Sequence, residues 1–484
     1  MPPSPRRALA WSFAERYLGL LVSIGSTMVL SRLLSPSEVG VYSLCAAFTV
    51  VAGILRDFGV SEYLIQEKEL TRDKLRAAYG IAFGIAWSIG AGIFFSRNAV
   101  SSFYNEPQVA DVLLVLTLHF FILPVSSPTF ALLNRELAFK KIFYLQLFCN
   151  STQAVTSVSM AFMGWGVMSL AWGPIANVAA QSLILLWMRP KEVLTWPGVR
   201  EVRSVLRFGS MFVASRTIEV LTRNFHEPVI GKMYDFASVG LFSRAFGLIE
   251  LFHSNIGAAV IRVATPAFAT EHRAGRPLDE VYARSTSIFV CVSWAFFGFI
   301  ALMAEPIIRV MFGPQWVEAA PIAVMLAISA LPQGVCALAP QMLSATGHVG
   351  KRLKVTLAVS PLHLIGVLIA APMGLRAVAA VWLFSSTATL LMYMYQLNKI
   401  LGLTASRLIT ALSPSFVVAS MSVASQAGVL WCMQFAAFPA LVQIPVTLTI
   451  GCVVWVICAR VVRHPAYDEI SVAWSAARSK LSRT

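Results

Sequence analysis

Apolar residues occur in long continuous runs along this chain, and short polar segments separate the runs. The stretch from Val446 to Ala459, for example, holds no charged side chain. A helix needs about 20 mainly apolar residues to cross the hydrocarbon core of a bilayer. Because the runs are continuous and do not alternate, they favour membrane-spanning helices over strands.

The pattern predicts about 14 membrane-spanning helices. Their expected ranges are 8–33, 37–65, 75–97, 109–133, 141–164, 166–188, 205–231, 236–266, 283–305, 317–345, 353–372, 374–397, 408–432 and 438–461. The longest connections, around 189–204 and 267–282, are too short to fold alone. We therefore expect an all-α polytopic membrane protein without a soluble domain.

Composition supports this class. Of the 484 residues, 57% are hydrophobic and 13% are charged, whereas soluble domains have roughly 25% charged residues. The net charge of +15 suggests nucleic-acid binding in a soluble protein, but membrane orientation explains it here. For this reason we expect no nucleic-acid partner. The cysteines lie in apolar segments without metal-ligand spacing, so we expect no metal. We also expect no other cofactor.

The lysines and arginines define an orientation. With an even number of spans, the majority fall on the side of the two termini. The connections on the other side hold only Arg32, Arg97, Lys232, Arg309 and Arg376. Cytoplasmic loops carry the excess of positive charge. We therefore predict a multi-pass protein of a bacterial inner membrane, with both termini in the cytoplasm.

The chain contains a predicted internal duplication. The segment Val39-Gly40-Val41-Tyr42-Ser43 recurs as Val239-Gly240-Leu241-Phe242-Ser243, and Leu123-Pro124 recurs as Leu331-Pro332. An even number of helices separates the copies, so the repeats are parallel. This predicts six-helix lobes at 1–200 and 201–402, two further helices at 403–463 and a cytoplasmic tail at 464–484. Two such lobes suit alternating access.

Ionisable residues inside the predicted helices are candidate site residues, because charge at bilayer depth is costly and marks function by default. They concentrate in the first two helices of each repeat. The candidates for substrate binding are Arg16, Arg56, Arg216, Arg223, Arg244, Arg262 and Asn255. The candidates for coupling to protons or sodium are Glu15, Asp57, Glu219 and Glu227.

Arginine in this setting favours an anionic ligand. Its planar guanidinium binds phosphate in a bidentate fashion and stays charged when desolvated. Arginines on several helices therefore suit a diphosphate or another polyanion. The alternative is that these residues form internal ion pairs, such as Glu15 with Arg56 or Arg216 with Glu219.

Motifs of covalent chemistry are missing from the sequence. It contains no Walker A loop, no Gly-x-Ser-x-Gly elbow and no His-Glu-x-x-His zinc motif. No connection on the predicted outer side is long enough for a catalytic pocket. We therefore predict a transport protein and not an enzyme.

Three segments carry a resemblance to a known family: Leu30 to Tyr42, Arg56-Asp57-Phe58-Gly59-Val60, and Leu132 to Phe139. They resemble bacterial polysaccharide-transport proteins, the lipid-linked oligosaccharide flippases of the multidrug/oligosaccharidyl-lipid/polysaccharide exporter superfamily. The resemblance implies two lobes in a V shape. It also implies flipping of undecaprenyl-diphosphate-linked oligosaccharide for exopolysaccharide, capsule or O-antigen assembly.

The resemblance also implies partners and site residues. The related lipid II flippase uses cavity arginines on its first, second and eighth helices, which match Arg16, Arg56 and either Arg244 or Arg262 here. The expected partners are the lipid-linked oligosaccharide and membrane lipids, with a polysaccharide polymerase and export machinery as further candidates. The alternatives are a multidrug or metabolite exporter on the same fold and a membrane polysaccharide polymerase or ligase.

Overall fold

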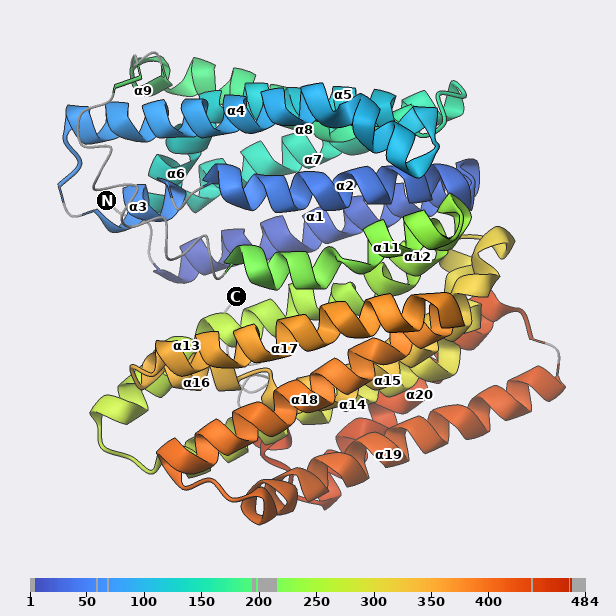
Figure 1. The fold of residues 1–484 in the computed structure, drawn as a ribbon. Helices are drawn as coiled ribbons and strands as arrows, with labels where there is room; N and C mark the ends of the chain where they lie inside the picture. Colours follow the sequence, from blue (N-terminus) through green and yellow to red (C-terminus); the bar gives the residue numbers. More distant parts are fainter. Residues whose placement is uncertain are drawn as a thin grey trace, which may run out of the picture. The chain divides into compact units, whose positions relative to one another are not determined.

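The structure is a computed structural model that describes residues 5–57, 60–67, 69–193, 197–198, 216–436, 438–469 and 471. Within these ranges the regular elements are helices, and no strand occurs (Figure 1). The predicted segment 205–215 and most of the predicted tail lie outside the described residues.

The first part of the chain forms these helices: α1 (Pro5–Leu33), α2 (Pro36–Asp57), α3 (Val60–Gln66), α4 (Arg72–Tyr104), α5 (Pro107–Ile122), η1 (Leu123–Val125), α6 (Ser127–Arg135), α7 (Phe139–Phe162), α8 (Met168–Met188), α9 (Pro190–Val193), a helical segment at 216–224, and α11 (His226–Met233).

The second part forms these helices: α12 (Phe236–Phe252), η2 (His253–Gly257), α13 (Ala258–Arg273), α14 (Leu278–Met311), η3 (Pro314–Ala319), α15 (Ala320–Cys336), α16 (Ala339–Ala345), α17 (Val349–Ala370), η4 (Ala371–Met373), α18 (Leu375–Leu401), α19 (Ala405–Phe435) and α20 (Ala440–Val461).

Among the described residues, 11 helices are long and apolar enough to cross a membrane. This confirms a polytopic all-α membrane protein. Helices α1 and α7, together with residues 216–233, lie where the remaining predicted spans were placed, and the total of about 14 stays a prediction.

The chain divides into two compact units, Met1–Gly240 and Leu241–Thr484. In the first unit, α7 packs between α1 and α8, while α5 packs against α2, α4 and α8. Helix α11 packs on α2. The predicted lobe boundary near 200 stays a prediction.

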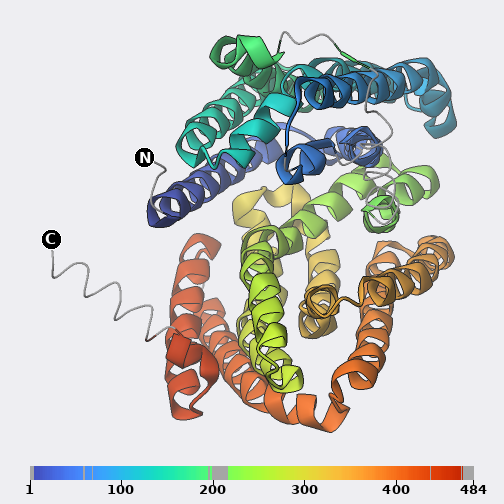
Figure 2. The ribbon, with the colours of Figure 1, turned by 90° about the vertical axis from the view of Figure 1, so that its left-hand side faces the viewer.

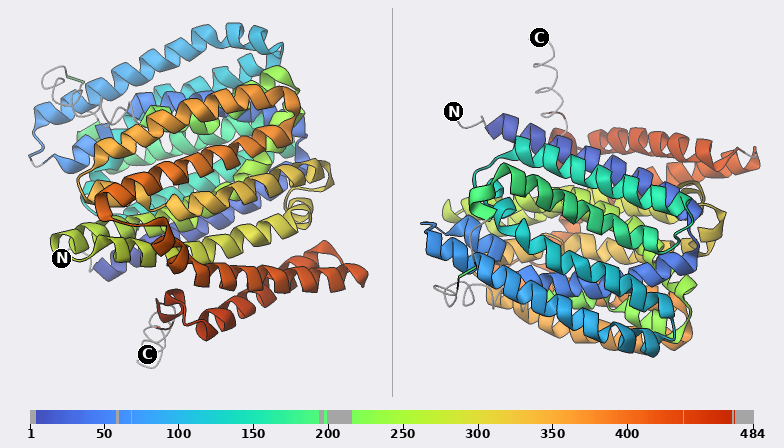
Figure 3. Two further views of the ribbon diagram at one scale, coloured as in Figure 1. Left: turned by 60° about the horizontal axis from the view of Figure 1, so that its bottom comes forward. Right: turned by 90° about the horizontal axis from the view of Figure 1, so that it is seen from above.

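In the second unit, α15 packs between α14 and α18, and α17 packs against α18 (Figure 2). Helices α19 and α20 lie side by side and both contact α14 (Figure 3). The pairing of α5 with α8 in the first unit thus recurs as α15 with α18. The short pair α3 and α6 recurs as α13 and α16. The internal packing of the units therefore follows the predicted duplication.

The repeated turn begins a helix in the same way in both copies. The backbone N–H of Glu38 donates to Ser35 Oγ at 3.3 Å, and the Glu38 carboxylate accepts from the Ser35 N–H at 2.7 Å. This is a capping box. In the second copy the Ser238 N–H donates to Asp235 Oδ1 at 2.8 Å. Hydrogen bonds from Ser238 lower the pKa of Asp235 below its ordinary value.

The two repeated glycines lie against each other within the first unit. A Cβ atom built on Gly40 would lie 1.7 Å from the carbonyl oxygen of Phe236, and one on Gly240 would lie 2.0 Å from that of Pro36. The first turns of α2 and α12 therefore cross with their backbones in contact. Only a residue without a Cβ atom fits either position.

Candidate functional site

Several of the helices that carry candidate residues are interrupted. Helix α2 ends at Asp57 and α3 begins at Val60, with residues 58–59 outside the described part of the chain. The next interrupted stretch is α5, η1 and α6, where Pro124 lies in the 3₁₀ turn. Discontinuous helices in membrane proteins line cavities and binding sites, because the freed backbone groups need polar partners.

The two interruptions in the first unit meet at one small hollow. Its lining consists of Arg56, Asp57, Val60, Ala82, Leu123, Pro124 and Ser127. Arg56 and Asp57 are the last residues of α2, whereas Leu123 and Pro124 form η1. The structure therefore brings two predicted site residues to the point where two broken helices meet.

One edge of the Arg56 guanidinium is paired with the carboxylate of Asp57. Its Nε and Nη2 atoms donate to Oδ1 of Asp57 at 3.0 and 2.7 Å. Its guanidinium carbon lies 5.8 Å from the ring centroid of Phe120, a cation–π arrangement. The Arg56 side chain is 13% exposed, and that of Asp57 is 50% exposed. Arg56 Nη1 makes no hydrogen bond to another described residue, so one donor remains for a ligand.

Side chains from neighbouring helices stabilise the broken stretch in the first unit. The Trp87 indole N–H donates to the Phe121 carbonyl at 3.3 Å, and the Ser182 hydroxyl donates to the Ile122 carbonyl at 3.4 Å. These bonds hold carbonyls next to η1, where the helical hydrogen-bond ladder stops.

In the second unit, side chains also donate hydrogen bonds to backbone carbonyls near a helix interruption. The Trp294 indole N–H donates to the Leu331 carbonyl at 3.0 Å, and the Tyr282 hydroxyl donates to the Val335 carbonyl at 3.2 Å. Both acceptors lie near the end of α15, before α16 begins. The prolines of this region predict bends, but the tryptophan and tyrosine donors could not be assigned from the sequence.

The stretch from α12 to α13 is interrupted by a π-helical turn, η2, that contains Asn255. The Asn255 side-chain amide donates to the Leu251 carbonyl at 2.9 Å and to Ser254 Oγ at 3.2 Å. Such turns are frequent at functional sites. The predicted site residue Asn255 therefore lies at a helix interruption, as Arg56 does.

The two arginines of this stretch differ in their surroundings. Arg244 lies over the rings of Phe312 and Trp316, with its guanidinium carbon 5.6 and 5.3 Å from their centroids. Arg262 is exposed and takes part in no ion pair with another described residue. These surroundings favour a packing role for Arg244 and leave Arg262 available to a ligand.

The remaining candidates lie on α1 and on residues 216–233. Arg216 and Glu219 form an ion pair at 3.5 Å, and both are about half exposed. Arg223, Glu227, Glu15 and Arg16 are partly buried. The Arg216–Glu219 pair matches one of the expected internal ion pairs. Arg56 pairs with Asp57 and not with Glu15.

No group of three or more His, Cys, Asp or Glu side chains within the described ranges is arranged to hold a metal ion. The described candidate residues are arginines, carboxylates and an amide, and Arg56, Asp57 and Asn255 among them lie at helix interruptions. This set can bind an anion by charge and hydrogen bonding.

The fold is shared with solved membrane proteins. The chain is similar to the lipid II flippase MurJ in its inward closed conformation, with a TM-score of 0.75 and 11% identity over 94% of this chain and 98% of that chain. It is also similar to an inward-facing multidrug resistance transporter of the MATE family, with a TM-score of 0.59 and 15% identity over 80% of this chain and 95% of that one. The chain has the fold of these membrane transporters.

Residues 29–321 match the family described as polysaccharide biosynthesis protein, and the chain belongs to that family. One relative is the lipopolysaccharide biosynthesis protein WzxC of Escherichia coli K12, 21% identical over 67% of this chain and 66% of its own length. Another is the succinoglycan biosynthesis transport protein ExoT of Rhizobium meliloti, 22% identical over 67% of this chain and 65% of its own length. The chain therefore aligns with just under two thirds of the length of these curated relatives.

Proposed function

We propose that this protein moves a lipid-linked oligosaccharide across the bacterial inner membrane by alternating access, for the assembly of a surface polysaccharide. The carrier would be undecaprenyl diphosphate or a similar polyprenyl diphosphate. The membership of the polysaccharide biosynthesis family, the name of the relative ExoT and the fold shared with a lipid II flippase support this proposal.

One observation carries the choice of an anionic passenger. Arg56 lies where two interrupted helices meet, and Asp57 occupies only two of its donor atoms. A phosphate oxygen has the charge and the acceptor geometry for a remaining guanidinium donor. In the proposed mechanism Arg56 binds the diphosphate and Arg262 is a further candidate for anion binding, while polar side chains meet the sugars and the lipid tail stays in the bilayer. No covalent step is required.

The other predicted residues have supporting roles in this proposal. Arg16, Arg216 and Arg223 add positive charge along the path of the diphosphate. Asp57, Glu219, Glu227 and Glu15 are candidates for coupling to protons or sodium. A transport assay in which the ion gradients are collapsed tests this coupling, since an unchanged rate would exclude it.

A multidrug exporter is the second candidate, because the MATE transporters share the fold. Many multidrug substrates are cations, and they favour acidic or aromatic sites, whereas the carboxylate in the described hollow is already paired with the Arg56 guanidinium. Efflux of a cationic dye by this protein would support the second candidate. A polymerase or ligase would instead elongate or transfer polymer when purified.

The proposal is tested by glycan export in a strain that depends on this protein. Arg56→Ala and Arg262→Ala remove a charged hydrogen-bond donor each, and a bond of about 1.5–3 kcal/mol corresponds to roughly 10- to 100-fold less export. Arg56→Lys keeps the charge but loses the planar guanidinium that can donate to Asp57 and to a ligand at once, so an intermediate rate is expected. Arg72→Ala, on an exposed arginine at the start of α4, is the matched control.

Full export by Arg56→Ala and Arg262→Ala would refute the assignment. Membrane abundance and the thermal midpoint of each variant are measured in parallel, because Arg56→Ala also leaves Asp57 without its partner. A physical association with a polysaccharide polymerase is a further expectation, which cross-linking in cells tests.

A further inference from the structure

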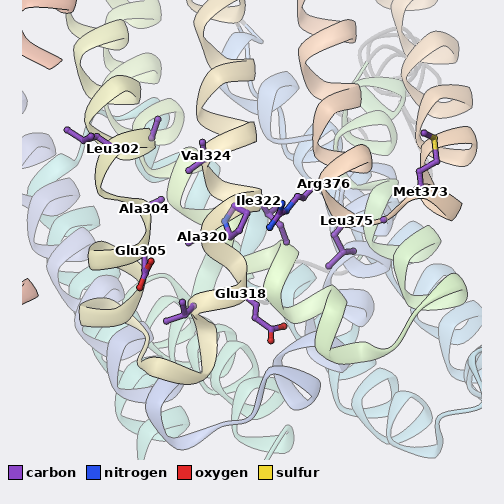
Figure 4. Close-up of a pocket in the computed structure, with 14 residues that line it drawn as sticks. Leu302, Ala304, Glu305, Glu318, Ala320, Ile322, Val324, Met373, Leu375 and Arg376 are labelled. Carbon is purple, nitrogen blue, oxygen red and sulfur yellow. The ribbon is translucent and has the colours of Figure 1, made fainter. Parts of the chain in front are cut away.

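A second cavity lies in the second unit, away from the helix interruptions. Its volume is about 810 Å³, within the range of roughly 300–1,000 Å³ typical of small-molecule sites. It lies between the ends of α14, α15 and α18 (Figure 4). Its lining includes Leu302, Glu305, Glu318, Ile322, Met373 and Arg376.

The polar residues of this cavity lie close to helix ends. Glu305 is in the last two turns of α14, Glu318 is in η3 just before α15, and Arg376 is the second residue of α18. The stretches that contain α14, α15 and α18 are each long and apolar enough to cross a membrane. The charged rim of the cavity therefore lies at the depth of the lipid headgroups and not in the hydrocarbon core.

Two opposite charges line the cavity without pairing. Glu305 is neutralised by Arg309, whose Nη2 lies 2.8 Å from Glu305 Oε1. Glu318 and Arg376 are exposed, and neither makes an ion pair or a side-chain hydrogen bond to another described residue. The lining of the cavity therefore includes a carboxylate and a guanidinium that are not paired with each other.

The kink of α14 leaves the backbone carbonyl of Leu302 as a possible hydrogen-bond acceptor. Pro306 has no N–H, so the carbonyl of Leu302, four residues earlier, lacks its usual helical donor. The backbone at Met303 departs from helical geometry, with φ −107° and ψ 15°. Leu302 is itself a lining residue. The Glu318 carboxylate is the acceptor that the cavity offers to a cationic donor, and the freed carbonyl belongs to a residue of the same lining.

We propose that this cavity binds the headgroup of a zwitterionic phospholipid with a primary ammonium, such as phosphatidylethanolamine. Its phosphate accepts hydrogen bonds from Arg376, and its ammonium donates to Glu318. The acyl chains follow the apolar lining, which includes Leu302, Ile322 and Met373. An anionic headgroup leaves Glu318 without a partner, and a choline headgroup has no N–H to donate.

The test measures lipid retained by the purified full-length protein in native mass spectrometry. The protein is offered phosphatidylethanolamine, phosphatidylglycerol and phosphatidylcholine with identical acyl chains. We expect preferential retention of phosphatidylethanolamine. Glu318→Gln and Arg376→Gln each lower its occupancy by about fivefold, the size expected for an interfacial charge pair. Glu280→Gln and Arg273→Gln, near the other end of the α13–α14 region, leave it unchanged.

The double variant Glu318→Arg with Arg376→Glu restores an opposite pair and recovers at least part of the occupancy. Unchanged occupancy and selectivity in both single variants would overturn the proposal. So would a loss of glycan export in these variants with lipid retention intact, which would make the cavity a glycan site. We expect the Arg56→Ala variant to retain as much phosphatidylethanolamine as the unaltered protein. The lipid-binding proposal and the flippase proposal are therefore tested independently.

Discussion

At the scale of single residues, the surroundings of each arginine separate packing from recognition. Arg56 shares its charge with Asp57 but keeps a donor atom at a helix interruption. Arg244 lies against two aromatic rings, whereas Arg262 is exposed without an ion pair to a described residue. A guanidinium that already contacts two rings contributes to stability, and one without protein partners is available to a ligand.

The different surroundings of Arg244 and Arg262 predict opposite effects when each residue is replaced. Arg244→Gln removes contacts to Phe312 and Trp316 and lowers the free energy of unfolding by about 1–2 kcal/mol. Arg262→Gln leaves the thermal midpoint unchanged and lowers glycan export. Thermal unfolding and export are measured for both variants. Normal export by Arg262→Gln together with loss of export, at normal stability, by Arg244→Gln would reverse the roles.

The sequence predicted which residue types occupy the site but not which of their atoms are engaged. The charge pattern alone made Arg56 and Asp57 candidates, because ionisable side chains at bilayer depth are conspicuous, and their role in binding stays a prediction. Their mutual ion pair was not predicted, since adjacent residues on a helix do not face each other. The pair forms at the last turn of α2, where the helix ends. Donors such as Trp87 were missed because no local pattern marks a side chain that caps a distant carbonyl.

At the scale of elements, the repeated Val-Gly segments have a physical reason. The first turns of α2 and α12 touch through Gly40 and Gly240. The repeat was visible in the sequence, but this contact was not, since sequence similarity does not tell that two copies meet. A proline such as Pro124 marks a bend in its helix, but the π-helical turn η2 contains no proline, so no residue pattern marked that interruption.

The glycine contact predicts strong intolerance of a methyl group. Gly40→Ala or Gly240→Ala places a Cβ atom on a backbone carbonyl and costs about 1–3 kcal/mol through overpacking. Gly247→Ala in the same helix α12 is the control, because a Cβ atom there meets no other atom within 4 Å. That substitution is neutral or slightly stabilising. Thermal midpoints of the purified variants measure this, and equal midpoints for Gly240→Ala and Gly247→Ala would contradict the close crossing.

A histidine after α20 predicts a pH-dependent contact. His464 is buried, accepts from the Ala466 N–H at Nδ1, and has Ser415 Oγ 2.8 Å from Nε2. Ser415 in turn donates to the Ser287 carbonyl at 3.0 Å. Burial lowers the pKa of His464 below its ordinary value of 6.5. The hydrogen bonds therefore need the neutral ring with the proton on Nε2.

Because the unfolded state binds a proton more readily, stability from this contact is full above about pH 6.5. It falls as the pH drops below that value toward the lower pKa of the folded state. Amide hydrogen exchange of residues 464–469 is measured from about pH 8 to about pH 5, after correction for the intrinsic exchange rate. We expect less protection at low pH. We expect His464→Gln to remove the pH dependence of the exchange protection. If the pH dependence persisted in that variant, a group other than His464 would cause it.

At the scale of the whole molecule, the class of the protein followed from hydropathy and charge alone. The described spans lie where the expected ranges place them, since the bilayer thickness sets their length. Helices α4 and α14 extend further into the connections than expected, because polar turns can continue a helix beyond the hydrocarbon core. The internal packing of the units follows the duplication. The orientation rests on the charge bias of the connections, which no feature of the fold itself determines.

Topology is therefore predicted as a labelling pattern. In a background without the native cysteines, Arg309→Cys and Arg376→Cys react with a membrane-impermeant maleimide in intact cells. Lys354→Cys and Lys399→Cys react only after the membrane is permeabilised. With the C-terminus in the cytoplasm, an even number of spans separates Lys354 and Lys399 from it, and an odd number separates Arg309 and Arg376 from it. Labelling of Lys354→Cys in intact cells would invert the assigned orientation.

The central claim is that fixed guanidinium groups on interrupted helices recognise the diphosphate of a lipid-linked glycan. The most direct measurement is translocation in proteoliposomes of a polyprenyl-diphosphate-linked oligosaccharide and of the same glycan on a neutral lipid. The account predicts translocation of the diphosphate-linked form only, and its loss in Arg56→Ala. Equal translocation of both lipids, or an undiminished rate in Arg56→Ala, would contradict it.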